Sequence, residues 1–269
     1  MQLKHLAWFA TSFLAVRSAA ADSTLHGETT PQSWLPNVLA TSVGTSIDAR
    51  LDYVRPDNAE DVTFIALGFH VQHLTPSGAG GYLMVPLAYL SGEGDSETEI
   101  GNLELGGLYA FRGGAGLDAY ARVGFAINTA TDLGALFVPL VNLAPRPTDA
   151  LTTGFDSNWL RAGGGVRARS GSLVYGGSAS VDVPLDAEDD FEYALLALAG
   201  SAGISEPGFG LTGGLSLLQT IGSEDDDNIV SFSLAFDVPV GPTRLVAAIG
   251  YNFEEGGAAS FGLGVRAGL

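Results

Sequence analysis

Apolar and polar residues alternate with a period of two along most of this chain, and that period favours β-strands over helices. Between Val43 and Tyr53 the odd positions are mainly apolar, whereas the even positions include Asp48, Arg50 and Asp52. The alternation recurs with varying clarity in twelve segments: residues 43–53, 62–74, 82–90, 100–112, 117–129, 159–169, 173–183, 192–204, 209–220, 229–238, 243–253 and 259–269. We therefore predict an all-β fold, an antiparallel up-and-down barrel of about twelve strands.

The connections between these segments alternate between short and long. The short ones are turns rich in glycine, proline and serine at residues 76–80, 113–116, 170–172, 205–208 and 239–242. The long ones span residues 55–61, 91–99, 130–158, 184–190, 222–228 and 254–258. They hold twenty carboxylates, against one, Glu206, in the short turns. Strict alternation places the long loops on one rim, and an even strand number places both chain ends on the other.

The distribution of arginine favours a transmembrane barrel over a soluble β-sandwich. Eight arginines fall on the polar face of the predicted strands, and none falls on the apolar face, where contact with lipid would cost ~2–4 kcal/mol at mid-depth. No lysine follows residue 21, although soluble proteins usually display many. Aromatic residues gather near the strand ends on the apolar face, as in interfacial girdles: Tyr53, Tyr89, Tyr109, Phe111, Tyr175, Phe209, Tyr251 and Phe253.

From residue 38 to Leu269 this pattern resembles bacterial outer-membrane β-barrel proteins in general. The last segment, Phe261 to Leu269, keeps the alternation but ends in Leu269, where such proteins often carry an aromatic residue. The resemblance implies a location in the bacterial outer membrane and insertion by the β-barrel assembly machinery. It also implies contact with outer-membrane lipids and lipopolysaccharide.

The first residues are expected to form an export signal, residues 1–21. Lys4 precedes an apolar run from Leu6 to Val16, and small residues at 18–21 offer a cleavage site. Residues 22–37 would then form a periplasmic leader, and residues 38–269 the barrel. After residue 21 the chain holds 10 Arg, no Lys and 30 Asp and Glu, a formal charge of −20, which disfavours nucleic-acid binding. There is no cysteine, so disulfides and thiolate metal sites are excluded.

Three acidic runs in the long loops are one candidate functional feature, at residues 93–97, 186–190 and 224–227. Carboxylate oxygens suit Ca²⁺ and Mg²⁺, so the runs could collect divalent cations or bridge through them to lipopolysaccharide. A solvated, mutually repelling rim is the alternative. We expect no cofactor and assign no metal site.

Charges on the polar strand face are the other candidate feature. The predicted lumen-lining residues are Arg50, Glu104, Arg112, Asp118, Arg122, Arg161, Arg167, Arg169, Asp237, Arg244 and Arg266. Most of the arginines fall toward the short-turn half. They could form a constriction that selects anionic or zwitterionic solutes, or salt bridges that fill the barrel. An apolar solute is a further possibility, if Tyr82, Met84 and Leu90 face inward.

The leading functional prediction is a small, charge-lined pore that lets small solutes pass. The alternative is a non-conducting structural or surface-interaction barrel whose acidic external loops bind cations or lipopolysaccharide. A lipid-acting enzyme is the least favoured class, because His70 falls on the polar face and His73 near the short-turn end, both away from the long loops. We therefore predict no enzymatic activity.

Overall fold

The computed structural model describes residues 43–56, 62–92, 95–113, 116–130, 157–185, 194–222, 228–241, 243–253 and 257–268. They form thirteen strand segments: β1 (Gly44–Pro56), β2 (Val62–Leu74), β3 (Ala79–Gly92), β4 (Asp95–Ile100), β5 (Leu103–Arg112), β6 (Leu117–Ile127), β7 (Trp159–Ser170), β8 (Leu173–Pro184), β9 (Ala194–Glu206), β10 (Phe209–Ile221), β11 (Asn228–Val240), β12 (Thr243–Asn252) and β13 (Ala258–Gly268). The predicted signal and leader, the acidic runs at 186–190 and 224–227, and residues 131–156 lie outside the described residues.

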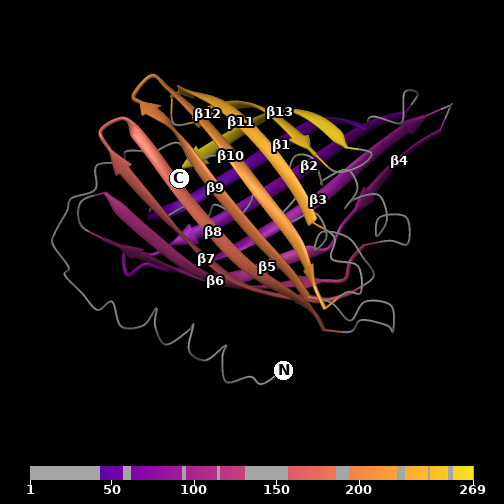
Figure 1. The fold of residues 1–269 in the computed structure, drawn as a ribbon, viewed down its shortest axis with the longest axis horizontal. Helices are drawn as coiled ribbons and strands as arrows, with labels where there is room; N and C mark the ends of the chain where they lie inside the picture. Colours follow the sequence, from indigo (N-terminus) through magenta and orange to yellow (C-terminus); the bar gives the residue numbers. More distant parts are fainter. Residues whose placement is uncertain are drawn as a thin grey trace.

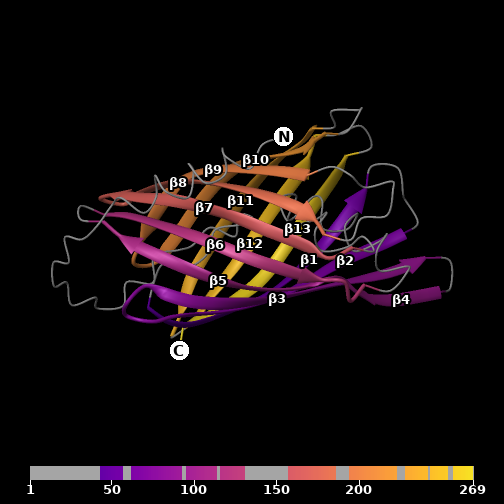
Figure 2. The ribbon, with the colours of Figure 1, turned by 90° about the horizontal axis from the view of Figure 1, so that it is seen from below.

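The strands close into a single antiparallel barrel (Figures 1 and 2). β1 pairs with both β2 and β13, and β2 pairs with β3, so the sheet has no open side. β4 and β5 both pair with β3 and are successive parts of one strand, which makes twelve strands, as predicted. No helix in the described part of the chain is long and apolar enough to cross a membrane.

The apolar faces of the strands point outward and the polar faces inward. Leu215 and Val123 are 60% and 57% exposed, whereas Asp182 and Arg161 are 0% and 1% exposed. A water-soluble protein buries its apolar face and exposes its charges, so this arrangement is inverted. The outer surface therefore suits contact with lipid, as the arginine distribution predicted.

Aromatic residues form belts at both ends of the outer surface. Tyr109 packs against Phe111 near the short turns, with ring centroids 4.7 Å apart, and Tyr251 packs against Phe253 near the other rim at 5.2 Å. Such belts anchor a barrel at the two membrane interfaces.

The predicted short turns all connect consecutive strands. Gly171 and Gly241 lie within two of them with φ of 62° and 61°, a conformation that glycine adopts without a steric cost. β1 begins at Gly44, opposite Leu74, and β13 ends at Gly268, opposite Ser46. Both described chain ends therefore lie on the short-turn rim, as predicted.

The prediction of a long loop at residues 91–99 is wrong. β3 continues to Gly92 and β4 begins at Asp95, so these residues form a hairpin that projects past the neighbouring strands (Figures 1 and 2). Glu97 and Glu99 lie on this hairpin opposite Leu90 and Ala88. The carboxylates that suggested a solvated loop therefore occupy alternate positions on one face of a strand.

Pro86 explains why β4 and β5 are separate segments. A proline has no N–H to donate to its neighbour, so a partner strand tends to bulge beside it. The pairing register of β3 shifts by one residue between β5 and β4, and the Gly101 N–H donates to the Pro86 carbonyl at 3.0 Å. The side chain of Asn102, in this bulge, is buried.

Candidate functional site

Four hydrogen-bonded side chains cross the inner face of β3, β5, β7 and β8. We call this set the tyrosine–arginine network: Tyr82, Glu104, Arg161 and Asp182. Arg161 Nε and Nη2 donate to the two carboxylate oxygens of Asp182 at 2.7 and 2.9 Å. Arg161 Nη1 donates to Glu104 Oε2 at 2.9 Å, and the Tyr82 hydroxyl donates to Glu104 Oε1 at 2.6 Å. Because all four residues are buried, each charge depends on its partners for stabilisation.

Glycines on β5 and β6 determine where Tyr82 lies. A Cβ on Gly124 would lie 2.1 Å from the Tyr82 hydroxyl oxygen, and a Cβ on Gly106 would lie 2.5 Å from Tyr82 Cε1. Tyr120 lies similarly over Gly165, where a Cβ would be 2.8 Å from Tyr120 Cε1. Each ring therefore lies along the wall in space that only glycine leaves free.

A second group of polar side chains connects β13, β1 and β2. Arg266 Nε donates to Asp48, and His70 Nδ1 lies 3.5 Å from Asp48 Oδ2. The His70 ring also meets the edge of Tyr82, with centroids 6.1 Å apart. Polar contacts therefore follow the inner wall from β8 through β7, β5, β3, β2 and β1 to β13.

Arginines from two walls approach each other in the short-turn half of the interior. Arg167 on β7 lies within electrostatic range of Asp118 on β6, Arg169 on the same strand, and Arg266 on β13. β7 and β13 are far apart in the strand order, so this approach crosses the lumen. Two carboxylates, Asp118 and the Asp48 that pairs with Arg266, stand against these three arginines, so the zone keeps a net positive charge.

The other predicted lumen residues also occupy inward register positions. Arg50 Nη2 donates to Asp52 at 2.6 Å, and Arg244 Nε donates to Asp237. Arg122 is buried on β6. The Arg112 backbone lies opposite Asp118. The predicted residues whose side chains the structure describes lie on the inward face, and their role in lining a passage stays a prediction.

Sequence reasoning left three residues of these two groups out of the predicted site: Tyr82 and Asp182 of the tyrosine–arginine network, and Asp48 of the second group. The two aspartates had a usable signal, because both fall on the polar face of clear period-two segments. Tyr82 had none, since segment 82–90 is apolar on both faces. Its inward direction follows from the register of β3 against β2 and β5.

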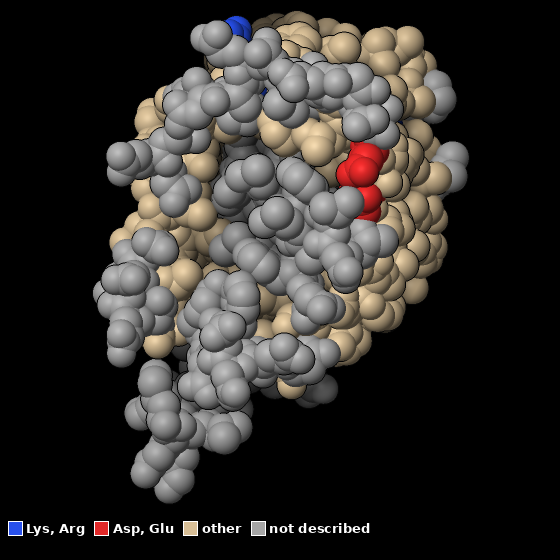
Figure 3. All heavy atoms as spheres, turned by 90° about the vertical axis from the view of Figure 1, so that its right-hand side faces the viewer, with Lys and Arg blue, Asp and Glu red and all other residues tan. Residues whose placement is uncertain are grey.

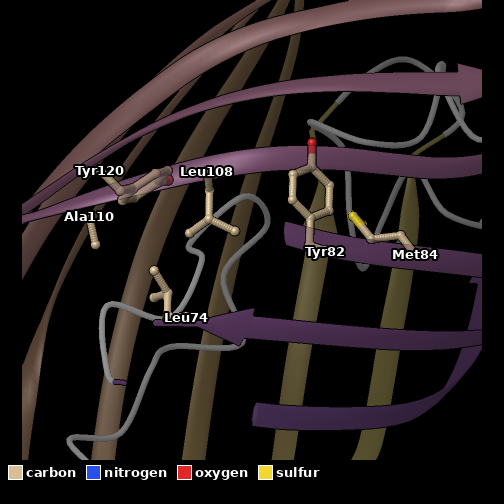
Figure 4. Packing of buried hydrophobic residues seen from close by; sticks show 6 residues of the cluster. All are labelled: Leu74, Tyr82, Met84, Leu108, Ala110 and Tyr120. Atoms are coloured by element: carbon tan, nitrogen blue, oxygen red, sulfur yellow. The ribbon is translucent and has the colours of Figure 1, made fainter. Parts of the chain in front are cut away.

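Apolar side chains also face the interior, mainly on and beside β3. Tyr82 and Met84 pack with Leu74, Leu108, Ala110 and Tyr120 (Figure 4). Nearer the loop rim, Ala88 packs with Val54, Phe64, Ala66 and Ala258, and Leu90 packs against this second cluster. Tyr82, Met84 and Leu90 therefore do point inward.

Carboxylates gather on one side of the barrel mouth at the loop rim (Figure 3). Glu97 on β4 is exposed, and Glu99 is partly buried. Among the described residues, no group of three or more acidic or histidine side chains could hold a metal ion. Cation binding by the other acidic runs stays a prediction, because they lie outside the part of the chain that the structure describes.

Asn102 holds the base of the longest connection, residues 130–158. Its Nδ2 donates to the Ser157 carbonyl at 3.2 Å, and its Oδ1 accepts from the N–H groups of Thr129 and Ala130 at 3.2 and 3.3 Å. One buried amide side chain thus links the two ends of the connection. The remaining residues of this connection, 131–156, lie outside the description.

The two described histidines occupy opposite faces of β2. His70 faces inward, as predicted, and His73 faces outward near the short turns. His73 Nδ1 shares a hydrogen bond of 2.9 Å with Thr45 Oγ1. These two residues are direct cross-strand neighbours on β1 and β2. Cross-strand polar pairs of this kind commonly stabilise a sheet.

The comparisons with known proteins agree with this architecture. No family model and no curated protein matches the sequence. Two solved structures of the KdgM porin, one in complex with disordered oligogalacturonate, are similar in fold. They share 10% and 11% identity with this chain, and each match covers 83% of this chain and 99% of the porin with a TM-score of 0.52.

This chain has the fold of bacterial outer-membrane β-barrel proteins. The inverted barrel establishes the lipid-facing exterior, and the likeness to the porin establishes the fold. At this level of identity the likeness says nothing of what this barrel carries.

Proposed function

We propose that this outer-membrane barrel is a channel for small solutes that filters them by charge. The observation that carries the proposal is the arrangement of the inner wall. The rings of Tyr82 and Tyr120 lie along the wall over glycines, and charged side chains form connected networks on the inner face. A barrel of twelve strands is wider than the eight-stranded barrels that side chains fill. The fold that it shares with a porin is in keeping with this proposal.

The filter would act without any covalent step. A solute entering from the loop side first meets carboxylates such as Glu97 and then the tyrosine–arginine network, which holds two carboxylates and one arginine. It next meets the positive zone around Arg167 and Arg169. Fixed charges in a narrow space of low dielectric constant act strongly on a passing ion. We therefore expect the short-turn half to favour anions or the anionic end of a zwitterion.

Substitution of Arg167 tests the filter directly. In a planar bilayer with a salt gradient, Arg167→Gln and Arg122→Gln should shift the reversal potential toward cation preference. Arg55→Gln is the matched control, because Arg55 is exposed at the loop rim and the charge change is the same. An equal shift in all three variants would mean that overall charge, and not the lumen, sets selectivity.

A closed structural barrel is the second candidate, and near-complete burial of the network favours it. Arg161 and Asp182 are almost inaccessible to solvent, as expected of a filled interior. In that case the acidic loops would be the functional surface and would meet cations or lipopolysaccharide. A correctly inserted protein that carries no current would support this candidate over the channel.

We assign no catalytic step to this barrel. The hydroxyl that His73 contacts belongs to Thr45, and the pair lies on the exposed face of a regular hairpin. In such a hairpin the backbone N–H groups are engaged in the strand ladder, so they are poor candidates for stabilising an oxyanion. Lipase activity of the refolded protein, abolished by His73→Ala, would overturn this assignment.

A further inference from the structure

One titratable side chain of the interior takes no part in the proposed charge filter. His70 on β2 faces inward, and its side chain is 16% exposed, so the solvent inside the barrel reaches it. His73, on the same strand, faces outward and contacts Thr45. Histidine is the side chain whose charge ordinarily changes between about pH 5 and pH 8. In the part of the barrel that the structure describes, His70 is therefore the one inward group of this kind.

Asp48 connects His70 to a permanent cation. Arg266 Nε donates to Asp48 Oδ1, and His70 Nδ1 lies 3.5 Å from the other carboxylate oxygen, Oδ2. This separation is longer than an ordinary hydrogen bond, so the neutral imidazole is not held tightly. A protonated imidazole would be attracted to Oδ2 and would share the carboxylate with Arg266.

The other titratable or charged groups that face His70 from its two neighbouring strands already have partners. On β1, Arg50 donates to Asp52 at 2.6 Å. On β3, the Tyr82 hydroxyl donates within the tyrosine–arginine network, and its ring meets the His70 ring with centroids 6.1 Å apart. Among the described residues, Asp48 is thus the carboxylate within salt-bridge distance of His70, and it is already paired with an arginine.

We propose that His70 makes the ion preference of the channel depend on pH. This inference rests on the proposed function and concerns its regulation. At about pH 8 the neutral imidazole leaves Arg266 and Asp48 to cancel each other. Toward about pH 5 the protonated imidazole adds one positive charge that this ion pair does not neutralise. Whatever the preference at high pH, a positive charge added to the inner wall shifts it toward anions.

The ratio of anion to cation permeability is the quantity to measure. It follows from reversal potentials of the refolded full-length protein in a planar bilayer with a salt gradient, recorded from about pH 8 to about pH 5.5. We expect the wild-type ratio to rise by about threefold or more toward acid. One unit charge roughly 7 Å from a passing ion changes its Boltzmann factor by about this amount in water.

Substitutions at His70 should fix the channel in one state or the other. His70→Gln cannot gain a proton, and it should hold the ratio near the alkaline value at every pH; His70→Asn serves if His70→Gln folds poorly. His70→Lys carries a fixed positive charge and should hold the ratio near the acid value. His73→Gln is the matched control, because it removes the outward histidine of the same strand, and it should keep the wild-type response.

The outcomes separate the two proposals. A wild-type ratio that does not change with pH, a response that survives in His70→Gln, or an equal loss in His73→Gln overturns the inference and leaves the channel standing. A protein that inserts but passes no current overturns the channel and the inference with it.

Discussion

Asp182→Asn should destabilise the barrel strongly, because Asp182 is the carboxylate that Arg161 holds with two hydrogen bonds. The substitution keeps the size of the side chain and removes its charge. Removing one partner of a buried ion pair costs about 3–5 kcal/mol, because the other charge is left uncompensated. Asn keeps one acceptor oxygen and Arg161 keeps Glu104, so we expect the lower end, about 3 kcal/mol.

The free energy of unfolding in phospholipid vesicles, measured by urea titration, checks this value. Tryptophan fluorescence is a suitable signal, since Trp159 is buried two residues from Arg161. Glu206→Gln, on an exposed residue beside a turn, is the control and should stay within about 0.5 kcal/mol of wild type.

A double-mutant cycle with Arg161→Met should give a coupling energy of about 1–3 kcal/mol between the two positions. A loss below about 0.5 kcal/mol in Asp182→Asn would mean that water screens the pair as it screens surface salt bridges. That result would refute the view that the network is buried and mutually dependent.

Three further substitutions have expected outcomes. Gly124→Ala should displace the Tyr82 ring from the wall and lower single-channel conductance, whereas Gly200→Ala, with no atom within 4 Å of the added Cβ, should leave conductance unchanged. Asn102→Ala leaves the Ser157 carbonyl and two N–H groups without their partner; we expect a loss of about 1–3 kcal/mol, with faster amide hydrogen exchange at Thr129 as the readout. Leu215→Arg puts a charge on the lipid-facing surface and should cost ~2–4 kcal/mol if the site lies at mid-depth, measured by the same unfolding titration; a neutral result would contradict lipid contact there.

Period-two alternation was sufficient to predict the strands, but a soluble sandwich or barrel would show the same alternation. The arginines then indicated which face points inward, since a charge is costly against lipid. The turns were equally predictable, because glycine and proline carry their conformational preference in any context.

The hairpin of β3 and β4 was not predictable by the same reasoning. Asp95, Glu97 and Glu99 lie at every second position, which is a strand pattern, but their charge suggested a solvated loop. Charged residues indicate that a segment is exposed to solvent, but they do not indicate whether it is a loop or a strand. A projecting hairpin is exposed and still has regular strand structure. The effect of Pro86 was only partly predictable. Its missing N–H indicates a weakened strand pairing, but it does not indicate where the partner strand will bulge.

The candidate site was predictable residue by residue but not as a set of contacts. The alternation places Glu104 and Arg161 on inward faces, yet their hydrogen bond depends on the register between strands far apart in sequence. The position of Tyr82 depends on two glycines in other strands, and no local pattern connects those three residues. The sequence therefore predicts which residues face inward, whereas the contacts between them depend on the pairing register of strands that are far apart in sequence.

Single-channel recording of the refolded protein in a planar bilayer tests the central claim most directly. A salt gradient across the bilayer reports ion preference in the same experiment. The account predicts discrete conductance steps with anion preference, reduced by Arg167→Gln and unchanged by Arg55→Gln. Protein that is folded and inserted but shows no steps would contradict the channel and favour a barrel closed by its own salt bridges.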